Sequence, residues 1–217
     1  MTAERTFDAF VFDLDGTLLD TLPDLVAVTN ETMTRFGYPT HDTAAVLAMV
    51  GNGLRSLIVQ ALPDGLSDKR TDEAVAFWKA AYDRRNHTGT KVYDGMAETL
   101  DELHARGKKL AVLSNKFDAG VKHVMARFLP NVMDFELGEG PVPRKPDPAG
   151  LLLVAETLGV DPARIAFVGD TAETDMQAAH NAGAYGIGVS WGYQPARILA
   201  AKADVLIDHP SQLLDFA

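Results

Sequence analysis

The sequence contains no cysteine, and this absence removes several chemistries at once. Without thiols the chain forms no disulfide, no thiolate metal site and no cysteine nucleophile. It also contains no apolar run approaching the ~20 residues that a membrane-spanning helix needs. Its first five residues are polar and do not resemble a hydrophobic leader. We therefore expect a soluble, cytoplasmic protein.

Positive charge is scarce. The chain has 20 Lys and Arg against 30 Asp and Glu, which gives a formal net charge of −10 and a pI near 5.0. A nucleic-acid partner requires a basic surface and an anionic membrane repels an acidic one, so we expect neither partner. An acidic protein that handles an anionic substrate needs a local cation, and a metal site is the natural source.

The composition that remains is that of a globular protein, with 217 residues of which 47% are hydrophobic. Short continuous apolar runs indicate strands of a parallel sheet that is covered on both faces. The runs occupy residues 9–12, 110–113, 165–168, 185–189 and 205–207. Helical patterns that stop at a glycine lie between them, at residues 96–106, 149–158 and 174–182. This alternation predicts an α/β fold with a Rossmann-like parallel sheet.

Residues 21–90 break the alternation, because they show helical periods and no convincing strand. Helices are expected at residues 21–36, 42–50, 54–62 and 68–85. About seventy residues of helix are too many for a simple crossover between two strands. We therefore expect a core domain of residues 1–20 and 91–217, with residues 21–90 inserted as a small α-helical cap domain.

Polar side chains follow three of the predicted strands: Asp13 and Asp15, Ser114 and Asn115, then Asp170, Thr171 and Asp175. In open α/β sheets the ligand crevice lies at the carboxyl ends of the strands, so we expect these side chains to meet at one edge. A single carboxylate after a strand is more often a cap or a turn residue, and only the combination favours a functional site. Clustered carboxylates repel one another unless a cation lies among them, and Mg²⁺ suits a few carboxylates together with water and phosphate.

Lys145 lies between prolines in "PVPRKPDP" (residues 141–148), a rigid loop ahead of a predicted helix. Taken alone, a lysine in a loop is expected to be exposed to solvent. Beside a site of metal and acids, a fixed ammonium group instead balances the charge of a bound phosphate. The combination favours phosphate chemistry.

Four ordered motifs resemble those of the haloacid dehalogenase superfamily. They are "DLDGT" (residues 13–17), "LSN" (113–115), "RKPDP" (144–148) and "VGDTAETD" (168–175). Their order and spacing match over essentially the whole chain, and the helical insert lies where that family carries a small cap. Within the superfamily, "MVGNG" (49–53), "VYDG" (92–95), "SNK" (114–116) and "GVSWGY" (188–193) are similar to the phosphoglycolate phosphatase subgroup.

The resemblance implies a phosphatase that works through an aspartyl-phosphate. Asp13 is then the nucleophile, and Asp15 protonates the leaving alcohol before it activates the hydrolytic water. Lys145 completes the implied catalytic set. The implied Mg²⁺ ligands are the Asp13 carboxylate, the Asp15 backbone carbonyl, Asp170 and Asp175. The implied phosphate-binding residues are Gly16, Thr17, Ser114, Asn115 through its backbone amide, and Lys145.

One spacing departs from the common pattern of the family. Four residues separate Asp170 from Asp175, where many members have three. Glu173 therefore competes for the second acidic metal position, and we favour Asp175.

The substrate that the resemblance implies is a small phosphorylated acid such as 2-phosphoglycolate. In the cap, Asn52, Gly53 and Arg55 offer amides and a guanidinium for a substrate carboxylate, although an arginine in a helix is more often simply exposed. A sugar-phosphate mutase shares all four motifs, and a pyrophosphatase or nucleotidase can carry the same cap, so these alternatives stay open. A dehalogenase has no use for Asp15, and a silent binding module has no need of a paired nucleophile and acid. We expect a monomer or a homodimer.

Overall fold

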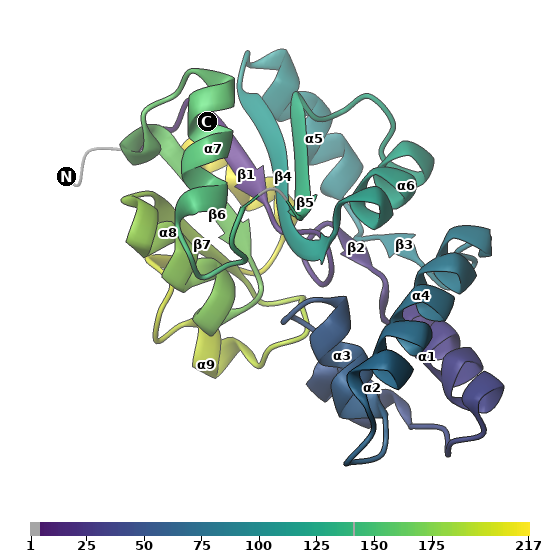
Figure 1. Cartoon of the computed structure of the whole chain (residues 1–217). Coiled ribbons are helices and arrows are strands. Elements are labelled where there is room, and N and C mark those ends of the chain that lie inside the picture. Colours follow the sequence, from purple (N-terminus) through teal and green to yellow (C-terminus); the bar gives the residue numbers. More distant parts are fainter. Residues whose placement is uncertain (1–4, 141) are drawn as a thin grey trace.

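The computed structural model describes residues 5–140 and 142–217. Six parallel strands in these ranges form one sheet in the order β5-β4-β1-β6-β7-β8 (Figure 1). The strands are β1 (Ala9–Phe12), β4 (Lys109–Phe117), β5 (Phe135–Glu139), β6 (Ile165–Gly169), β7 (Tyr185–Val189) and β8 (Val205–Ile207). The predicted α/β fold with a Rossmann-like parallel sheet is confirmed.

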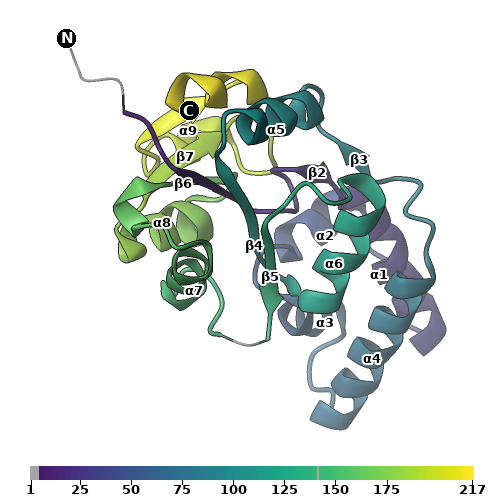
Figure 2. The same cartoon turned by 90° about the horizontal axis from the view of Figure 1, so that it is seen from above.

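Helices cover both faces of the sheet, because successive side chains of each strand point in opposite directions. Phe10 and Phe12 pack in one hydrophobic cluster with α5 (Met96–Ala105) and α6 (Asp118–Phe128). Val11 packs in a second cluster with α7 (Ala149–Leu158) and α8 (Gln177–Ala182). Figure 2 shows the two pairs of helices on opposite sides of the strands. This double burial explains why the strand sequences are continuously apolar.

The apolar patterns of the sequence do not predict α6 and β5. The strand β5 has the sequence FELGE and lies at the edge of the sheet, where three of its five residues are only partly buried. An edge strand lacks the continuous apolar run of the central strands, because one side of it has no neighbouring strand. The helix α6 then supplies the crossover that a parallel β4-β5 pair requires.

Residues 21–90 contain four helices: α1 (Leu22–Phe36), α2 (Thr43–Met49), α3 (Leu54–Ala61) and α4 (Asp68–Arg84). Local sequence explains where they begin and end. The side chain of Asp42 accepts a hydrogen bond from the Ala45 amide at the start of α2, and Ser67 does the same for the Arg70 amide at the start of α4. Gly37 ends α1 in the left-handed conformation, with φ of 79°.

Two short strands connect the helical segment to the rest of the chain. β2 (Leu19–Asp20) pairs antiparallel with β3 (Lys91–Val92), so the chain enters and leaves the helical segment side by side. The predicted division into residues 1–20 with 91–217 and residues 21–90 falls at this pair. Residues 1–4 and Pro141 of the predicted core lie outside the described residues.

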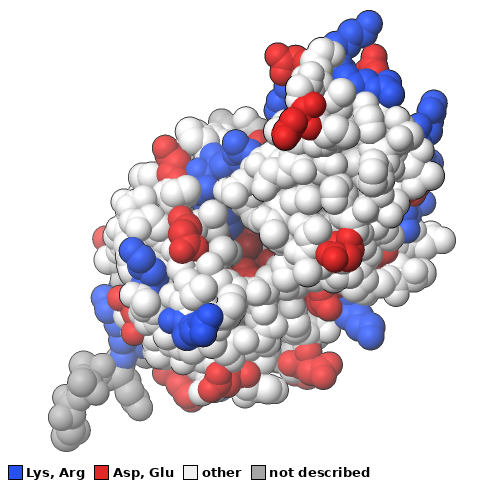
Figure 3. Space-filling view, turned by 90° about the horizontal axis from the view of Figure 1, so that it is seen from below, with Lys and Arg blue, Asp and Glu red and all other residues white. Residues whose placement is uncertain are grey.

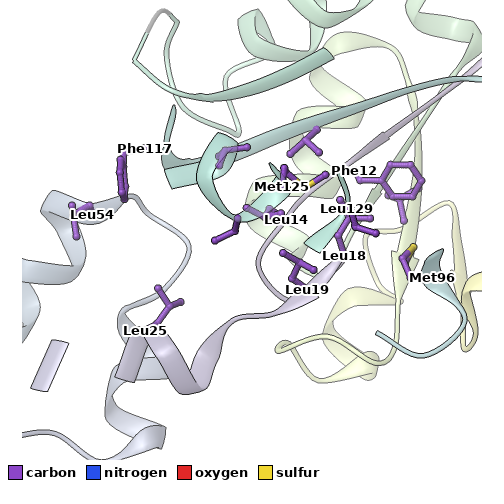
Figure 4. Packing of buried hydrophobic residues seen from close by; sticks show 14 of the residues in the cluster. Phe12, Leu14, Leu18, Leu19, Leu25, Leu54, Met96, Phe117, Met125 and Leu129 are labelled. Carbon is purple, nitrogen blue, oxygen red and sulfur yellow. The ribbon is translucent and has the colours of Figure 1, made fainter. Parts of the chain in front are cut away.

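The turn after β1 is anchored by its own apolar side chains. Leu14, Leu18 and Leu19 are fully buried and pack in the cluster that also holds Leu25 of α1 and Phe117 of β4 (Figure 4). The apolar side chains of this turn therefore pack in the core, while its polar side chains lie at the edge of the sheet. This packing holds the acids of the turn in place and joins the sheet to the helical segment.

Candidate active site

Three of the predicted polar residues meet at the carboxyl edge of the sheet. Asp13 follows β1, which lies between β4 and β6, and its amide donates to the Val168 carbonyl oxygen of β6 at 2.9 Å. Asp170 follows β6, and Ser114 belongs to the end of β4. Parallel strands place such residues at one edge, as the sequence predicts.

A buried lysine lies among three buried acids. Asp13, Asp170 and Asp175 each present a carboxylate oxygen within 4.8 Å of the others. The Lys145 Nζ lies 2.8 Å from Asp13 Oδ1 and 2.7 Å from Asp175 Oδ1. Lys145, which the sequence alone suggests is a surface residue, is only 5% exposed, so its ammonium group contacts this cluster and not solvent. In the space-filling view, acidic atoms lie at the bottom of a hollow (Figure 3).

The cluster has more negative than positive charge. Burial raises the pKa of Asp13 to about 6, against the opposing effect of Lys145. Burial, together with the nearby Asp175 carboxylate, raises the pKa of Asp170 to about 8. The Lys145 ammonium, 2.8 Å from Asp13 Oδ1 and 2.7 Å from Asp175 Oδ1, is one positive charge shared among three carboxylates. A divalent cation bound among these acids would offset these penalties, and the set of oxygen donors fits Mg²⁺.

Gly16 allows the turn after β1 to approach the acids. Its φ of 87° is left-handed, and a Cβ at this position would collide with the Asp170 carboxylate. The neighbouring Thr17 is fully buried, and its hydroxyl has no hydrogen-bond partner. Neither residue belongs to the lining of the cavity described below. In this structure both residues shape the turn, and their part in phosphate binding stays a prediction.

The Asp15 carboxylate does not join the cluster of three acids. Instead it accepts a hydrogen bond of 2.6 Å from the Thr21 hydroxyl, and the Lys116 Nζ lies 3.0 and 3.1 Å from its two oxygens. Burial opposes the charge on Lys116, but the Asp15 carboxylate raises the pKa of the lysine above its ordinary value. The lysine stays protonated beside the predicted acid. Sequence reasoning assigned no role to Lys116, and its only signal was the "SNK" motif.

The side chain of Asn115 binds backbone groups on both sides of the site. Its Oδ1 accepts from the Lys145 amide at 2.9 Å, and its Nδ2 donates to the carbonyl oxygens of Lys145 at 3.1 Å and Gly51 at 2.9 Å. Its predicted role in phosphate binding rests on the backbone amide, because the side chain is fully occupied. The nearby Ser114 hydroxyl accepts from the Lys116 amide at 3.3 Å and lines the cavity.

Tyr193 is a second residue that sequence reasoning missed. Its amide donates to Asp170 Oδ2 at 2.7 Å, and its hydroxyl accepts hydrogen bonds of 2.9 Å from the amides of Thr21 and Leu22. The residue thus links an acid of the cluster to the start of α1. The "GVSWGY" motif (188–193) was the available signal for this tyrosine.

Asp175 and the competing Glu173 face different environments. Asp175 is fully buried and accepts hydrogen bonds from the Thr171 amide and hydroxyl, both at 3.0 Å. Glu173 is exposed and accepts from Gln194 at 2.9 Å. Both residues belong to a π-helical turn, Ala172–Met176, which accommodates the longer spacing and turns Asp175 inward. Only Asp175 joins the cluster of acids.

A cavity of about 260 Å³ lies between the sheet edge and the cap helices. Its cap side consists of uncharged residues: Leu25, Leu47, Val50, Gly51, Gly53, Leu54, Leu57 and Trp78. Among the described lining residues, the cations are Lys116 and Lys145 of the core. The predicted cap residue Gly53 is present in this wall.

Arg55 does not reach the cavity. Its guanidinium pairs with Asp68 and Asp72 on the outer surface, where its side chain is 49% exposed. The spacing of the buried residues of α3, Leu54, Leu57, Ile58 and Ala61, could have shown that Arg55 lies off the inner face. Asn52 is also absent from the lining, and its carbonyl oxygen accepts a hydrogen bond from Arg144. The Arg55 guanidinium therefore faces away from the cavity, as the alternative of an exposed helical arginine expects, and binding of a substrate carboxylate by the amides of Asn52 and Gly53 stays a prediction.

A family model of haloacid dehalogenase-like hydrolases matches residues 10–189 of the chain. The chain belongs to this family. A phosphoglycolate phosphatase from Pseudomonas putida is 35% identical over 204 residues, which are 91% of the chain and 74% of the relative. Another from Vibrio vulnificus is 33% identical and is matched over 98% of the chain and 96% of its own length. These relatives identify this member of the haloacid dehalogenase-like family as a phosphatase.

Solved structures agree with the family assignment. The crystal structure of a predicted phosphoglycolate phosphatase from Haemophilus somnus superposes with a TM-score of 0.87. The two proteins are 28% identical, and the match covers 99% of this chain and 98% of the other. None of the helices in the described ranges is long and apolar enough to cross a membrane.

Proposed function

We propose that the protein is a Mg²⁺-dependent phosphomonoester hydrolase in which Asp13 attacks phosphorus and becomes an aspartyl-phosphate. The position of Asp13 carries this proposal. It stands at the end of a buried central strand, borders the cavity, and lies 2.8 Å from the ammonium group of Lys145. A buried carboxylate beside a fixed cation is suited to meet an anionic phosphate.

The Asp13, Asp170 and Asp175 carboxylates, with the Asp15 backbone carbonyl, would hold the Mg²⁺ ion. When bound, the ion neutralises negative charge on the carboxylates and on the phosphoryl group. The raised pKa values of Asp13 and Asp170 support this assignment, because each reflects a buried charge that lacks a sufficient positive partner.

The chain's own residues then divide the reaction into two steps. In the first, a carboxylate oxygen of Asp13 forms a bond to phosphorus as the ester P–O bond breaks, and Asp15 gives its proton to the departing alkoxide. In the second, Asp15 takes a proton from water as the water oxygen attacks the phosphoryl group, and the Asp13 carboxylate leaves. Lys145, the Ser114 hydroxyl and the Asn115 amide hold phosphoryl oxygens through both steps.

A small phosphorylated acid such as 2-phosphoglycolate is the substrate that the relatives suggest. The cap wall offers no side-chain cation for its carboxylate, since Arg55 faces outward, so a carboxylate would have to rely on backbone amides or on Lys116. Sugar phosphates, nucleotides and pyrophosphate therefore belong in the same comparison. A location in the cytoplasm and a monomeric or homodimeric state complete the proposal.

Release of inorganic phosphate from a panel of these compounds tests the proposal. We expect turnover of phosphomonoesters that excess EDTA abolishes and added Mg²⁺ restores. Undiminished turnover in excess chelator would overturn the metal assignment. Conversion of glucose 1-phosphate to glucose 6-phosphate, with a bisphosphate primer and without net phosphate release, would identify a mutase instead.

A further inference from the structure

Asp15 is held by side chains from two separate parts of the chain. Thr21, at the start of the helical segment, donates to Asp15 Oδ1 at 2.6 Å. Lys116, at the end of β4, donates to Oδ1 at 3.0 Å and to Oδ2 at 3.1 Å. Because the lysine contacts both oxygens, it restrains the rotation of the carboxylate as well as its position.

The environment of Lys116 leaves it few alternative partners. Its side chain is 4% exposed, and its own amide donates to the Ser114 hydroxyl, which holds the backbone beside the phosphate-binding residues. Lys116 lines the cavity but points at the predicted acid, whereas Lys145 contacts the predicted nucleophile. The two buried lysines therefore serve two different carboxylates.

A ring of the cap lies against the same ammonium group. The Lys116 Nζ is 4.7 Å from the centre of the Tyr82 ring of α4, within the range of a cation–π contact. Tyr82 stacks on Trp78, with ring centres 4.9 Å apart and planes 9° apart, and Trp78 lines the cavity. The Tyr82 hydroxyl also lies close enough to the ammonium group to raise the pKa of Lys116, and the ring makes the cation–π contact.

We propose that Lys116 is a positioning residue for Asp15, and that the Tyr82 ring makes this positioning depend on the cap. The inference rests on the proposed function, in which Asp15 is the acid that protonates the leaving alcohol. Lys116 aims the carboxylate without touching the reacting atoms. When the cap helices lie over the site, the Tyr82 ring restrains the ammonium group and hence the acid; when they move away, that restraint is lost.

A misplaced general acid slows the reaction of some substrates more than others, depending on whether the leaving group needs a proton. This difference provides the test. An alkoxide leaving group needs a proton as the P–O bond breaks, whereas p-nitrophenolate departs without one. We therefore compare kcat/KM for ethyl phosphate, an alkyl ester without a carboxylate that Lys116 could bind, with kcat/KM for p-nitrophenyl phosphate, since this constant reports the steps up to departure of the alcohol.

Lys116→Met should lower kcat/KM for the alkyl substrate at least ~10-fold more than for p-nitrophenyl phosphate, because general acid catalysis contributes ~10²–10⁴-fold. The inhibition constant of inorganic phosphate should change little, since Lys145 and Ser114 remain. Lys122→Met, which removes an exposed lysine of α6, is the matched control and should behave like the wild type. Equal losses on both substrates, or a large rise in the phosphate inhibition constant, would overturn the positioning role.

Asp15→Asn separates a failure of this inference from a failure of the proposed function. It should show the same selective loss, and the double variant with Lys116→Met should lose little more than Asp15→Asn alone. If Asp15→Asn shows no selectivity, the proposed acid is wrong. If it does and Lys116→Met does not, only the role of Lys116 fails.

The contribution of the cap is tested at Tyr82. Tyr82→Leu removes the ring and should lower kcat/KM for the alkyl ester more than for p-nitrophenyl phosphate, by a smaller factor than Lys116→Met does. Tyr82→Phe keeps the ring and should have the wild-type ratio of these two kcat/KM values. A wild-type ratio in Tyr82→Leu would overturn the link to the cap. Thermal melting of each variant shows whether it is folded.

Discussion

Asn115 and Lys145 are joined by a reciprocal pair of hydrogen bonds. The Lys145 amide donates to Asn115 Oδ1 at 2.9 Å, and Asn115 Nδ2 donates to the Lys145 carbonyl oxygen at 3.1 Å. The same Nδ2 donates to the Gly51 carbonyl oxygen in the helical segment. One side chain at the end of β4 thus fixes the lysine loop and contacts the loop before α3.

Asn115→Ala should therefore weaken both the fold and catalysis. Loss of these buried hydrogen bonds should lower the free energy of unfolding by about 2 kcal/mol, since each contributes ~0.5–1.5 kcal/mol. The rate should fall because the Lys145 ammonium is no longer held in place. Urea unfolding and phosphate release measure the two effects. The control is Asn181→Ala, which removes two exposed hydrogen bonds, one to the Pro146 carbonyl oxygen and one from Gln177 Nε2. Equal effects of the two substitutions would contradict the special role of Asn115.

Asp13→Asn should abolish phosphatase activity while preserving the fold. A nucleophile replaced by an amide should cost ~10³-fold or more in kcat. The metal-free variant should be at least as stable as the wild type at pH 7, because burial already disfavours the ionised form of Asp13, whose pKa is raised to about 6. Steady-state kinetics and thermal melting in EDTA provide the measurements. Wild-type turnover by this variant would mean that another residue is the nucleophile.

Mg²⁺ should raise the melting temperature of the wild type, because an ion that binds only the folded acid cluster stabilises it. Asp175→Asn should lose most of this shift, because it removes one of the three clustered carboxylates. Glu173→Gln is the matched control and should keep the full shift. The opposite pattern would assign the second acidic position to Glu173.

Stability should fall between pH 7.5 and 5.5 partly because of His87. Burial lowers the pKa of this histidine, against the opposing effect of Asp24, and both ring nitrogens lack hydrogen-bond partners. The contribution of His87 to the free energy of unfolding is complete above its pKa in the unfolded chain, ~6.5. It is lost as the pH falls through the lower pKa of the folded protein, because the unfolded chain then binds a proton that the folded chain disfavours.

His87→Asn should flatten this dependence. Asparagine tolerates the positive φ of 44° at this position, so the backbone is not strained by the substitution. The measurement is the urea midpoint at both pH values, with the exposed His104→Asn as the control. An unchanged slope in His87→Asn would show that other groups account for the pH dependence.

The sequence predicts the parts of the molecule that follow from local patterns. Continuous apolar runs predict the central strands, and the polar residues that end them predict which side chains meet, because parallel strands share one carboxyl edge. Asp13, Asp170 and Lys145 converge as expected. The edge strand β5 was not predictable in this way, because its mixed sequence lacks the apolar run of a strand buried on both sides.

The orientation of individual side chains was decided by tertiary packing. Arg55 faces outward because the apolar face of α3 faces inward, and the Asn115 side chain forms hydrogen bonds with the backbone of Gly51 and Lys145. The pairing of Lys116 with Asp15 joins residues 101 positions apart.

The sequence by itself thus determined the fold class, the family and the acids and lysine of the site, since these follow from periodicity and from motifs along the chain. Only the tertiary structure decided which lysine serves which carboxylate and which cap residues face the cavity. Those outcomes depend on contacts between segments that the chain brings together only when it folds. Local patterns carry no information about such contacts.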